Sequence, residues 1–344
     1  MPHSRPTVEQ DDVKAVSDVL ASGEIAQGEK VCEFEKAVAR FVEAKYAIAC
    51  SSGTSALHLA LLSLGVGAGD EVIIPSYVCS APYFATLHTG AEPRIADISL
   101  SDLNLCADTV KRQISSKTKA IVLPHMFGTP AEIDEVLKFD VPVVEDCAQS
   151  IGADFQGRQV GGFGDLAIFS FYATKMITTG EGGMALTNSG ELYSRLAELR
   201  EYDEKPLTTL RFNYKMTDFQ AALGISQLKK LPDFIQRRRD IASRYSERFS
   251  QQSIETPRVF SHKKSVFYRY IIMVDNAEGV QKRVKQKGVM CEKPVPEPLH
   301  RGLSIFNCPN SDEAYEHALS VPLYPSLTEP EIAHVLETFD AVLG

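Results

Sequence analysis

The chain has 344 residues, of which 44% are hydrophobic and 24% are charged. This composition is close to that of an ordinary globular protein and argues against disorder, collagen and a coiled coil. The chain carries 45 acidic and 36 basic residues, a formal net charge of −9, so bulk charge gives no support for binding to nucleic acid. The length is sufficient for one large core or for two unequal ones.

No segment approaches the roughly 18 uninterrupted apolar residues of a membrane span. The N-terminal sequence MPHSRPTVEQDDVK is too polar for a signal peptide. We therefore expect a cytoplasmic protein that does not bind membranes. The seven cysteines are dispersed and contain no C-x-x-C pair, which predicts reduced thiols and no metal site.

Seven short apolar runs bounded by turn residues predict seven strands. The runs are YAIAC, EVIIP, PRIAD, AIVLP, VPVVED, LAIFSF and MALTN, which begin at Tyr46, Glu71, Pro93, Ala120, Val141, Leu166 and Met184. Most of them are unbroken runs of strand-forming residues. Such runs are typical of strands buried on both faces of a mainly parallel sheet.

Amphipathic segments between the early runs predict helices. The segment TSALHLALLSLG places Leu57, Leu61 and Leu64 on one stripe, and ADTVKRQISSK and PAEIDEVLKF are similar. The alternation of strand and helix defines an α/β fold. Because the link between the last two strands is too short for a helical crossover, we expect a mixed sheet with one antiparallel strand.

The pattern changes at about Gln227, where a long polar helix begins. This helix leads into strand-like FYRYIIMV, a helix through GVQKRVKQKG and a closing helix from Thr328. We predict a large domain over residues 1–235 and a smaller C-terminal α/β domain over 236–344, entered through the long helix. Arginines 237–239 are expected to form a solvated helix face.

Polar side chains follow three of the predicted strands, at the edge where open α/β sheets bind ligands. After the first strand, residues 51–55 read SSGTS and open a helix, whose amides and dipole suit a phosphate, although such residues also cap helices without a ligand. Asp146 ends the fifth strand, where a helix cap is the simpler interpretation. Lys175 follows the sixth strand beside a glycine-rich turn and could equally be a solvated lysine.

The glycine-rich turn also contains Gly180, Gly182 and Ala185, which match G-x-G-x-x-A. The match leads into a strand rather than into a helix, so we reject a dinucleotide-binding site. Taken together, the three strand ends offer amides for a phosphate, an anion for a pyridinium nitrogen and a lysine for an aldehyde. Pyridoxal phosphate (PLP) requires this combination.

The sequence resembles the DegT/StrS family of PLP-dependent sugar-nucleotide aminotransferases, which have the fold type I of aspartate aminotransferase. The resemblance covers nearly the whole chain. It is carried by SGEIAQGEKVCEFE, SSGTSALHLAL, GDEVIIPS, PHMFGTPAEID, VVEDCAQSIGA, GGFGDLAIFSFYATKMITTGEGGMALTN, RFNYKMTDFQAALGISQL and ALSVPLYPSLTEPE.

The resemblance implies a role for several residues. Lys175 would bind the cofactor aldehyde covalently and later carry a proton between cofactor and substrate, and Asp146 would keep the pyridine nitrogen protonated. The other implied cofactor contacts are Gly53, Thr54, Ser55, Cys79, Gln149, Ser170 and, from the partner subunit of a homodimer, Asn213. Cys79 stands where many relatives have an aromatic residue that stacks on the ring, so stacking is weaker here or comes from Tyr77.

The resemblance also implies an amino acid donor, by family habit glutamate, and a nucleotide-linked keto sugar as acceptor. Candidate substrate contacts are His300, Lys293, Arg269 and Tyr172. A surface histidine is the alternative for His300, and solvated basic residues are the default interpretation of Lys293 and Arg269. Two alternatives stay open. One is a dehydratase of the same family, in which histidine replaces the lysine, and the other is a PLP-binding regulatory protein.

Overall fold

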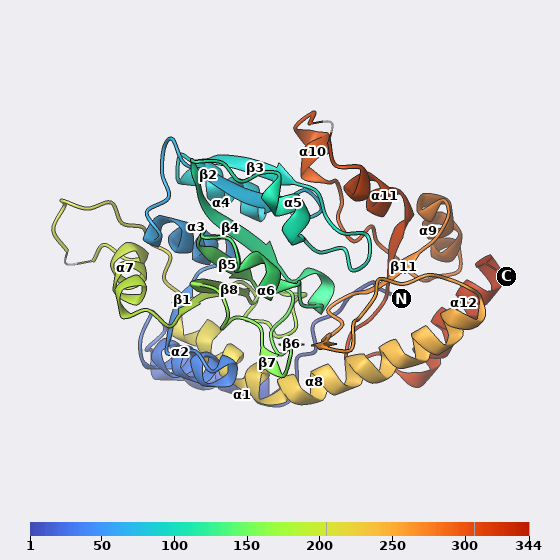
Figure 1. Cartoon of the computed structure of the whole chain (residues 1–344). Coiled ribbons are helices and arrows are strands. Elements are labelled where there is room, and N and C mark those ends of the chain that lie inside the picture. Colours follow the sequence, from blue (N-terminus) through green and yellow to red (C-terminus); the bar gives the residue numbers. More distant parts are fainter. Residues whose placement is uncertain (204, 306, 344) are drawn as a thin grey trace.

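The computed structural model describes residues 1–203, 205–305 and 307–343. A seven-stranded sheet with the order β1-β9-β8-β5-β4-β2-β3 lies at its centre (Figure 1). Its strands are β1 (Tyr46–Cys50), β2 (Glu71–Pro75), β3 (Glu92–Ala96), β4 (Thr118–Pro124), β5 (Val143–Asp146), β8 (Leu166–Ser170) and β9 (Gly183–Thr187). All seven predicted strands are therefore present in one sheet.

Strand β9 is the antiparallel member of this sheet. It pairs antiparallel with both of its neighbours, β1 and β8, whereas the remaining pairs are parallel. The link between β8 and β9, residues 171–182, contains no helix, whereas a parallel return is usually made through a helical crossover. The predicted mixed, mostly parallel sheet is confirmed.

Side chains of the central strands alternate between two apolar cores, as the period of two requires. On β4, Ile121 and Leu123 lie in one core with residues of α2 (Glu29–Val42) and of the first part of α8 (Asp218–Gln251). Ala120 and Val122 lie in the other core with α3 (Gly53–Ser63), α4 (Ala81–His88) and α7 (Gly190–Arg200). Helices thus cover both faces of the sheet.

The remaining elements are short or belong to the C-terminal part. They are α1 (Gln10–Ser22), α5 (Ala107–Lys111), η1 (Met126–Gly128), α6 (Ile133–Val136), β6 (Asp154–Phe155), β7 (Arg158–Gln159), β10 (Lys263–Lys264), β11 (Tyr270–Met273), α9 (Ala277–Gln286), α10 (Leu299–Gly302), α11 (Pro309–His317), β12 (Ala318–Val321) and α12 (Glu329–Leu343). Helices α5 and α6 are shorter than predicted. After α5, Ser115 Oγ donates to Glu71 of β2 at 2.6 Å, and this turn leads the chain directly into β4.

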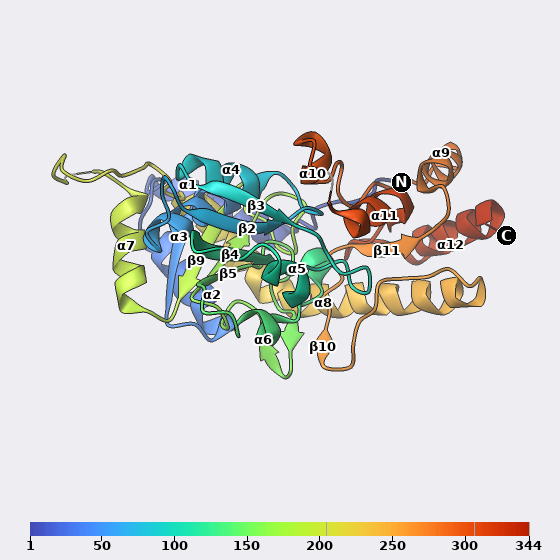
Figure 2. The same ribbon diagram turned by 45° about the horizontal axis from the view of Figure 1, so that its top comes forward.

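Helix α8 runs from beneath the sheet to the C-terminal helices (Figure 2). It begins at Asp218, nine residues earlier than predicted, because Thr217 and Gln220 form a capping box. Pro232 lies within the helix without ending it. The second part of α8 joins β11, β12, α9 and α12 in a third apolar core. The proposed boundary at 235/236 falls inside this continuous helix and stays a prediction.

The predicted solvated arginine face of α8 is wrong for Arg238. This residue is only 4% exposed and donates from Nη1 to the carbonyl oxygens of Phe267, Tyr268 and Leu323. The carbonyls belong to irregular backbone, which has no strand partner and must find donors elsewhere when buried. Arg238 thereby attaches α8 to the segment that precedes β11.

Among the described residues, no helix combines the length and the hydropathy needed to cross a lipid bilayer.

Candidate active site

The alternation of β5 and β8 brings two of the predicted site residues to one face of the sheet. Val144 and Ile168 lie in the core that contains α3. Asp146 and Ser170, each two residues further along its strand, therefore end on the same face. Because β1, β5 and β8 are parallel, their carboxyl ends meet the start of α3 at one edge of the sheet.

The start of α3 forms an anion cradle, which we define as residues 52–55 together with Ser170. Ser52 Oγ accepts from the amide of Ser55 at 3.1 Å, and Ser55 Oγ accepts from the amide of Ser52 at 2.9 Å. This capping box uses the amide of Ser55, whereas those of Gly53 and Thr54 have no intrahelical partner. Capping and anion binding are thus compatible here.

Gly53 is required by the close approach of the helix to β8. A Cβ atom on this residue would lie 2.8 Å from Cβ of Ser170, which is closer than real side chains come. The absence of a side chain therefore brings the Ser170 hydroxyl against the open amides of α3. This arrangement fits a phosphate group.

Asp146 is buried and only partly hydrogen bonded. Its Oδ1 accepts from the amide of Ala148 at 3.0 Å, and within the described residues its Oδ2 has no hydrogen-bond partner. The pKa of Asp146 is raised, mainly because of its burial, while the Ala148 bond and the charge of Lys175 oppose the rise. A desolvated carboxylate with a free oxygen suits a bound cation such as a protonated pyridine.

Lys175 is half-buried, and among the described residues it forms no ion pair with a carboxylate. Its Nζ lies 5.1 Å from the ring centroid of Tyr268, which precedes β11. Burial would raise the pKa of Tyr268, but the charges of Lys175 and Arg269 outweigh it and lower this pKa to about 8. The sequence analysis did not identify Tyr268, because 93 residues separate it from the lysine and no local pattern links them.

Gln149 has one end fixed and one end free. Its Oε1 accepts from the amide of Phe127 at 2.9 Å. Because the amide can only donate, the oxygen of the side chain must face it, which leaves Nε2 as a donor towards the site. Phe127 itself adopts the left-handed conformation with φ of 58°, so this bond also holds an unusual turn. The orientation fits a contact with the cofactor's ring oxygen.

Cys79 lies near the reacting groups, whereas Tyr77 does not face the site. As a residue Cys79 is exposed, yet surrounding protein desolvates its thiol and raises the pKa, with the charges of Lys175 and Asp146 acting in opposite directions. Tyr77 is fully buried, and its hydroxyl donates to the Ala314 carbonyl at 3.3 Å. Stacking on a cofactor ring by Tyr77 is therefore wrong.

Two of the predicted substrate residues are available at the site. Tyr172 is 47% exposed and lies three residues before Lys175. Arg269 is partly buried, its Cζ is 5.6 Å from the Tyr268 ring centroid, and its Nη1 is buried with no hydrogen-bond partner among the described residues. This unpaired guanidinium nitrogen can donate a hydrogen bond to an anionic group of the substrate.

The other two substrate candidates are occupied within the chain. His300 is not a surface residue, because it is 3% exposed. Its Nδ1 lies 2.6 Å from Ser76 Oγ and its Nε2 3.2 Å from Asp312 Oδ1. Lys293 Nζ lies 4.7 Å from the Tyr315 ring centroid and donates to the carbonyl of that residue. Neither side chain reaches a substrate without giving up these partners.

Asn213 is exposed and lies in the segment between α7 and α8, which has no regular secondary structure around this residue. The amide of Ser51, at the entrance of the cradle, donates to the carbonyl of the next residue, Tyr214, at 2.8 Å. The segment is thus tied to the cradle while Asn213 points to solvent. This placement is compatible with a contact to a second subunit.

A buried network supports β5 from the opposite face of the sheet. Glu145 accepts from the amides of Gly161, Phe163 and Gly164 at 2.7–2.8 Å and from His125 Nε2 at 3.1 Å. His125 Nδ1 accepts from the Ala131 amide at 3.0 Å. His125, Glu145 and Cys147 lie close enough to hold a metal ion, but these bonds already use the histidine nitrogens and both carboxylate oxygens. Their role in this structure is to hold the loop over residues 161–164.

Replacing Glu145 by glutamine should lower the free energy of unfolding by about 3 kcal/mol, because an amide group would face backbone donors that now share a charge. Burial would raise the pKa of Glu145, but the bonds from His125 and the amides outweigh it and lower this pKa. Its contribution is therefore present at neutral pH and lost as the pH falls through the folded-state pKa.

Urea unfolding followed by circular dichroism measures this effect. The matched control is Glu135→Gln, which removes an exposed carboxylate paired with Lys138 and should change stability by less than about 1 kcal/mol. Equal stability of the Glu145 variant and the wild type at pH 7 would contradict the prediction.

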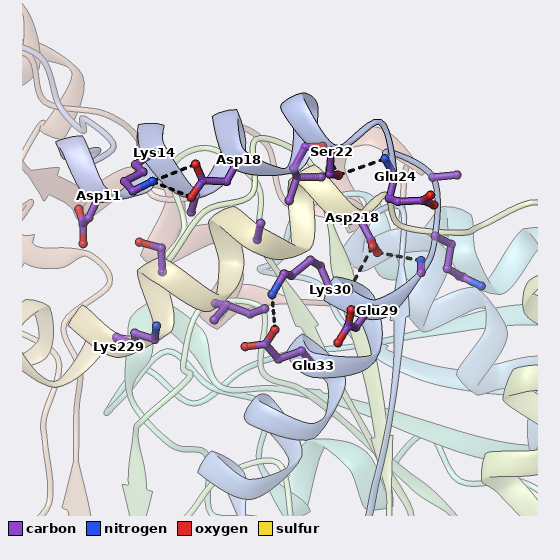
Figure 3. Close-up of a pocket in the computed structure, with 18 residues that line it drawn as sticks. Asp11, Lys14, Asp18, Ser22, Glu24, Glu29, Lys30, Glu33, Asp218 and Lys229 are labelled. Atoms are coloured by element: carbon purple, nitrogen blue, oxygen red, sulfur yellow. Dashed lines mark hydrogen bonds and ion pairs between the residues drawn. The ribbon is translucent and has the colours of Figure 1, made fainter.

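A large cavity lies away from these residues. It has a volume of about 790 Å³ and lies between α1, α2 and the start of α8 (Figure 3). Its walls carry the ion pairs Lys14–Asp18 and Lys30–Glu33. Asp218 accepts from the amides of Gly28, Lys30 and Val31 there and caps α2. None of the predicted cofactor or substrate residues lines this cavity.

Comparison with known proteins gives close matches over the whole chain. The aminotransferase TlmJ from Streptoalloteichus hindustanus superposes with a TM-score of 0.95 at 29% identity, over 100% of this chain and 98% of that chain. Spr1654 from Streptococcus pneumoniae, in its PLP form, superposes with a TM-score of 0.94 at 27% identity, over 100% and 98%. GDP-perosamine synthase of Escherichia coli O157:H7 is 31% identical over 363 residues, which cover 99% of this chain and 98% of the relative.

The fold is therefore that of a PLP-dependent aminotransferase of fold type I. The sequence also matches the DegT/DnrJ/EryC1/StrS aminotransferase family over residues 6–340. The chain belongs to this family, as the sequence resemblance predicted.

Proposed function

We propose that the protein transfers an amino group from an amino acid, with glutamate as the donor, to a keto sugar linked to a nucleotide, for the synthesis of amino-deoxysugars of surface polysaccharides or antibiotics. The observation that carries this proposal is the convergence of the anion cradle, the free oxygen of Asp146 and the unpaired Lys175 at one sheet edge. PLP, when bound there, supplies an electron sink for the negative charge that forms on the substrate carbon.

Phosphate binding, ring orientation and proton transfer are assigned to residues of the chain itself. The cradle would bind the phosphate through the amides of Gly53 and Thr54 and the hydroxyl of Ser170. Asp146 would hold the proton on the ring nitrogen, and Gln149 Nε2 would orient the ring. Lys175 would release its bond to the cofactor and then act as the base that moves a proton between the two carbons.

The two half-reactions test this function separately. The PLP form is mixed with glutamate, and the pyridoxamine form is then offered a panel of nucleotide-linked keto sugars, with the cofactor absorbance as the readout. Recovery of the PLP spectrum by one sugar identifies the acceptor. If the protein binds PLP but reacts with no amino acid, the regulatory protein is the correct alternative. A dehydratase is disfavoured by the presence of Lys175 where that branch has histidine.

We further infer a cytoplasmic homodimer with shared active sites. Reduced cysteines suit a cytoplasmic protein, and all seven are free in the structure. The segment after α7 projects from the body of the protein (Figure 1), and its Tyr202, Leu207 and Leu210 are exposed. Exposed apolar side chains next to Asn213 support a contact with a second copy of the chain.

Mixed dimers test the shared site. Lys175→Ala removes the reacting amine, and Asn213→Ala removes a charge-assisted hydrogen bond to the phosphate, which should weaken PLP binding by about 10-fold to 100-fold. In a mixed dimer of the two variants, one site has both lesions and the other has none. Co-expression at limiting PLP should therefore restore activity that neither parent shows. Mixed dimers that form without regaining activity would show that Asn213 serves its own chain.

A further inference from the structure

His58 is a buried polar residue on the phosphate-binding helix that the function described above does not use. It lies on α3 and is 3% exposed. Its Nδ1 is 3.2 Å from the hydroxyl of Tyr214, and within the described residues its buried Nε2 has no hydrogen-bond partner. Burial, together with the nearby His88, lowers the pKa of His58 to about 4, so the ring is neutral at physiological pH.

The ring of His58 also supports a pair of stacked aromatic side chains. Phe212 and Tyr214 stack with a centroid distance of 5.0 Å and an interplanar angle of 13°. His58 meets the Phe212 ring edge-on at 4.9 Å. We call these three residues the aromatic anchor. Its rings bury apolar area between α3 and the segment that leads to α8, which stabilises this contact.

Asn213 lies between the two stacked residues and points away from them. Phe212 and Tyr214 are half-buried, whereas Asn213 is exposed. The backbone on both sides is fixed, because the amides of Phe212 and Tyr214 donate to the carbonyls of Leu199 and Arg200 at 2.9 and 3.0 Å. The rings of Phe212 and Tyr214 stack on each other, and the residue between them is the exposed one. Seating residues 212 and 214 on α3 therefore turns residue 213 outward.

We propose that His58 is a positioning residue that, through the aromatic anchor, presents Asn213 to the cofactor phosphate in the partner subunit. This inference rests on the shared-site dimer of the proposed function. Its consequence is that the phosphate helix of one subunit supports phosphate binding in the other.

Three variants test the positioning role. Each apoprotein is titrated with PLP, and binding is monitored by fluorescence. His58→Leu keeps the volume near the rings but removes the hydrogen bond, and Tyr214→Phe removes the same bond from its other end. Each should weaken PLP binding by about 5-fold, the effect of one neutral hydrogen bond, with Asn213→Ala as the stronger reference. The matched control is Ser63→Ala, which alters a buried hydroxyl at the far end of α3 and should leave PLP affinity unchanged.

These titrations separate the inference from the proposed function. Weak binding by Asn213→Ala combined with wild-type binding by Tyr214→Phe and His58→Leu would overturn the inference and leave the shared site standing. Wild-type binding by Asn213→Ala would overturn the shared site itself. If His58→Leu fails to fold, Tyr214→Phe alone decides the question.

Mixed dimers show in which subunit His58 acts. In a dimer of His58→Leu with Lys175→Ala, the site with an intact lysine receives Asn213 from a chain whose His58 is intact. At limiting PLP, borohydride should fix as much cofactor to Lys175 in this dimer as in a dimer of wild type with Lys175→Ala. Less cofactor on Lys175 would mean that His58 supports the cradle of its own chain, and the proposal would be overturned.

Discussion

Replacing Lys175 by alanine should lower kcat by about 1000-fold or more, because the variant loses both the amine that bonds to the cofactor and the base that moves the proton. The half-buried position of Lys175 and its lack of an ion-pair partner in the described structure leave the amine available for this chemistry. The fold should persist, because alanine leaves the backbone bond from the Lys175 amide to the Tyr172 carbonyl in place. Steady-state kinetics with the identified acceptor measures the effect.

A chemical label provides the independent readout for Lys175. Borohydride reduction of the PLP-loaded wild type followed by peptide mapping should find the cofactor on this lysine. The matched control is Lys14→Ala, which removes an exposed lysine from α1 and should keep full activity. A label on another lysine, or activity of the Lys175 variant within a few fold of wild type, would contradict the assignment.

Replacing Asp146 by asparagine should lower kcat by about 100-fold to 1000-fold, because a neutral amide cannot stabilise the positive charge on the ring nitrogen. The substitution is nearly isosteric, and the Ala148 amide keeps an oxygen acceptor. The half-reaction with glutamate under single-turnover conditions measures the loss. A rate within a few fold of wild type would mean that Asp146 is only a structural residue.

The pH dependence of PLP binding separates the charge of Asp146 from its shape. Burial raises the pKa of this carboxyl in the apoprotein. Wild-type PLP affinity should therefore fall as the pH decreases through that pKa, where the carboxyl becomes neutral. The Asp146→Asn variant has no such group and should lose this part of the pH profile. The matched control is Asp154→Asn, which changes a carboxylate in the small sheet of β6, β7 and β10 and should keep the wild-type profile.

The strand ends were predictable because their signals are local. The run LAIFS defines β8, and its period of two fixes the face on which Ser170 ends. The same holds for Asp146 at the end of β5. The cradle followed from SSGTS at the start of an apolar helix. The placement of Asp146 and of residues 51–55 needed only the residues within one element and the rule that parallel strands share an edge. The role of Ser170 came from the family resemblance.

The remaining parts of the site depend on contacts between distant segments. Tyr268 approaches Lys175 from a segment whose backbone is hydrogen bonded to Arg238 of α8. His300 is buried and hydrogen bonds to Ser76, which lies 224 residues away in the sequence. Contacts between residues so far apart in the chain leave no periodic pattern in a single sequence. The exposure and partners of these side chains therefore required the tertiary structure.

The early start of α8 was missed for a related reason. Its first part is buried between α2 and the N-terminal segment, where small residues replace the usual apolar stripe. At Gly224 a Cβ atom would lie 2.5 Å from the ring of Phe34, so the two helices meet at a glycine. Glycine has a low helix propensity, so the residue that permits this close contact also weakens the local helix signal.

Strand β5 carries two adjacent carboxylates that face opposite sides of the sheet, one fully bonded at Glu145 and one partly free at Asp146. A slip of β5 by a single residue would reverse both directions. Glu145 would then face the proposed cofactor site, and Asp146, which we propose contacts the ring nitrogen, would be placed among backbone donors. Insertions or deletions before β5 should therefore be tolerated only where the turn at residues 137–142 absorbs them. The spacing between that turn and the two acids is the quantity that a designer altering this region has to preserve.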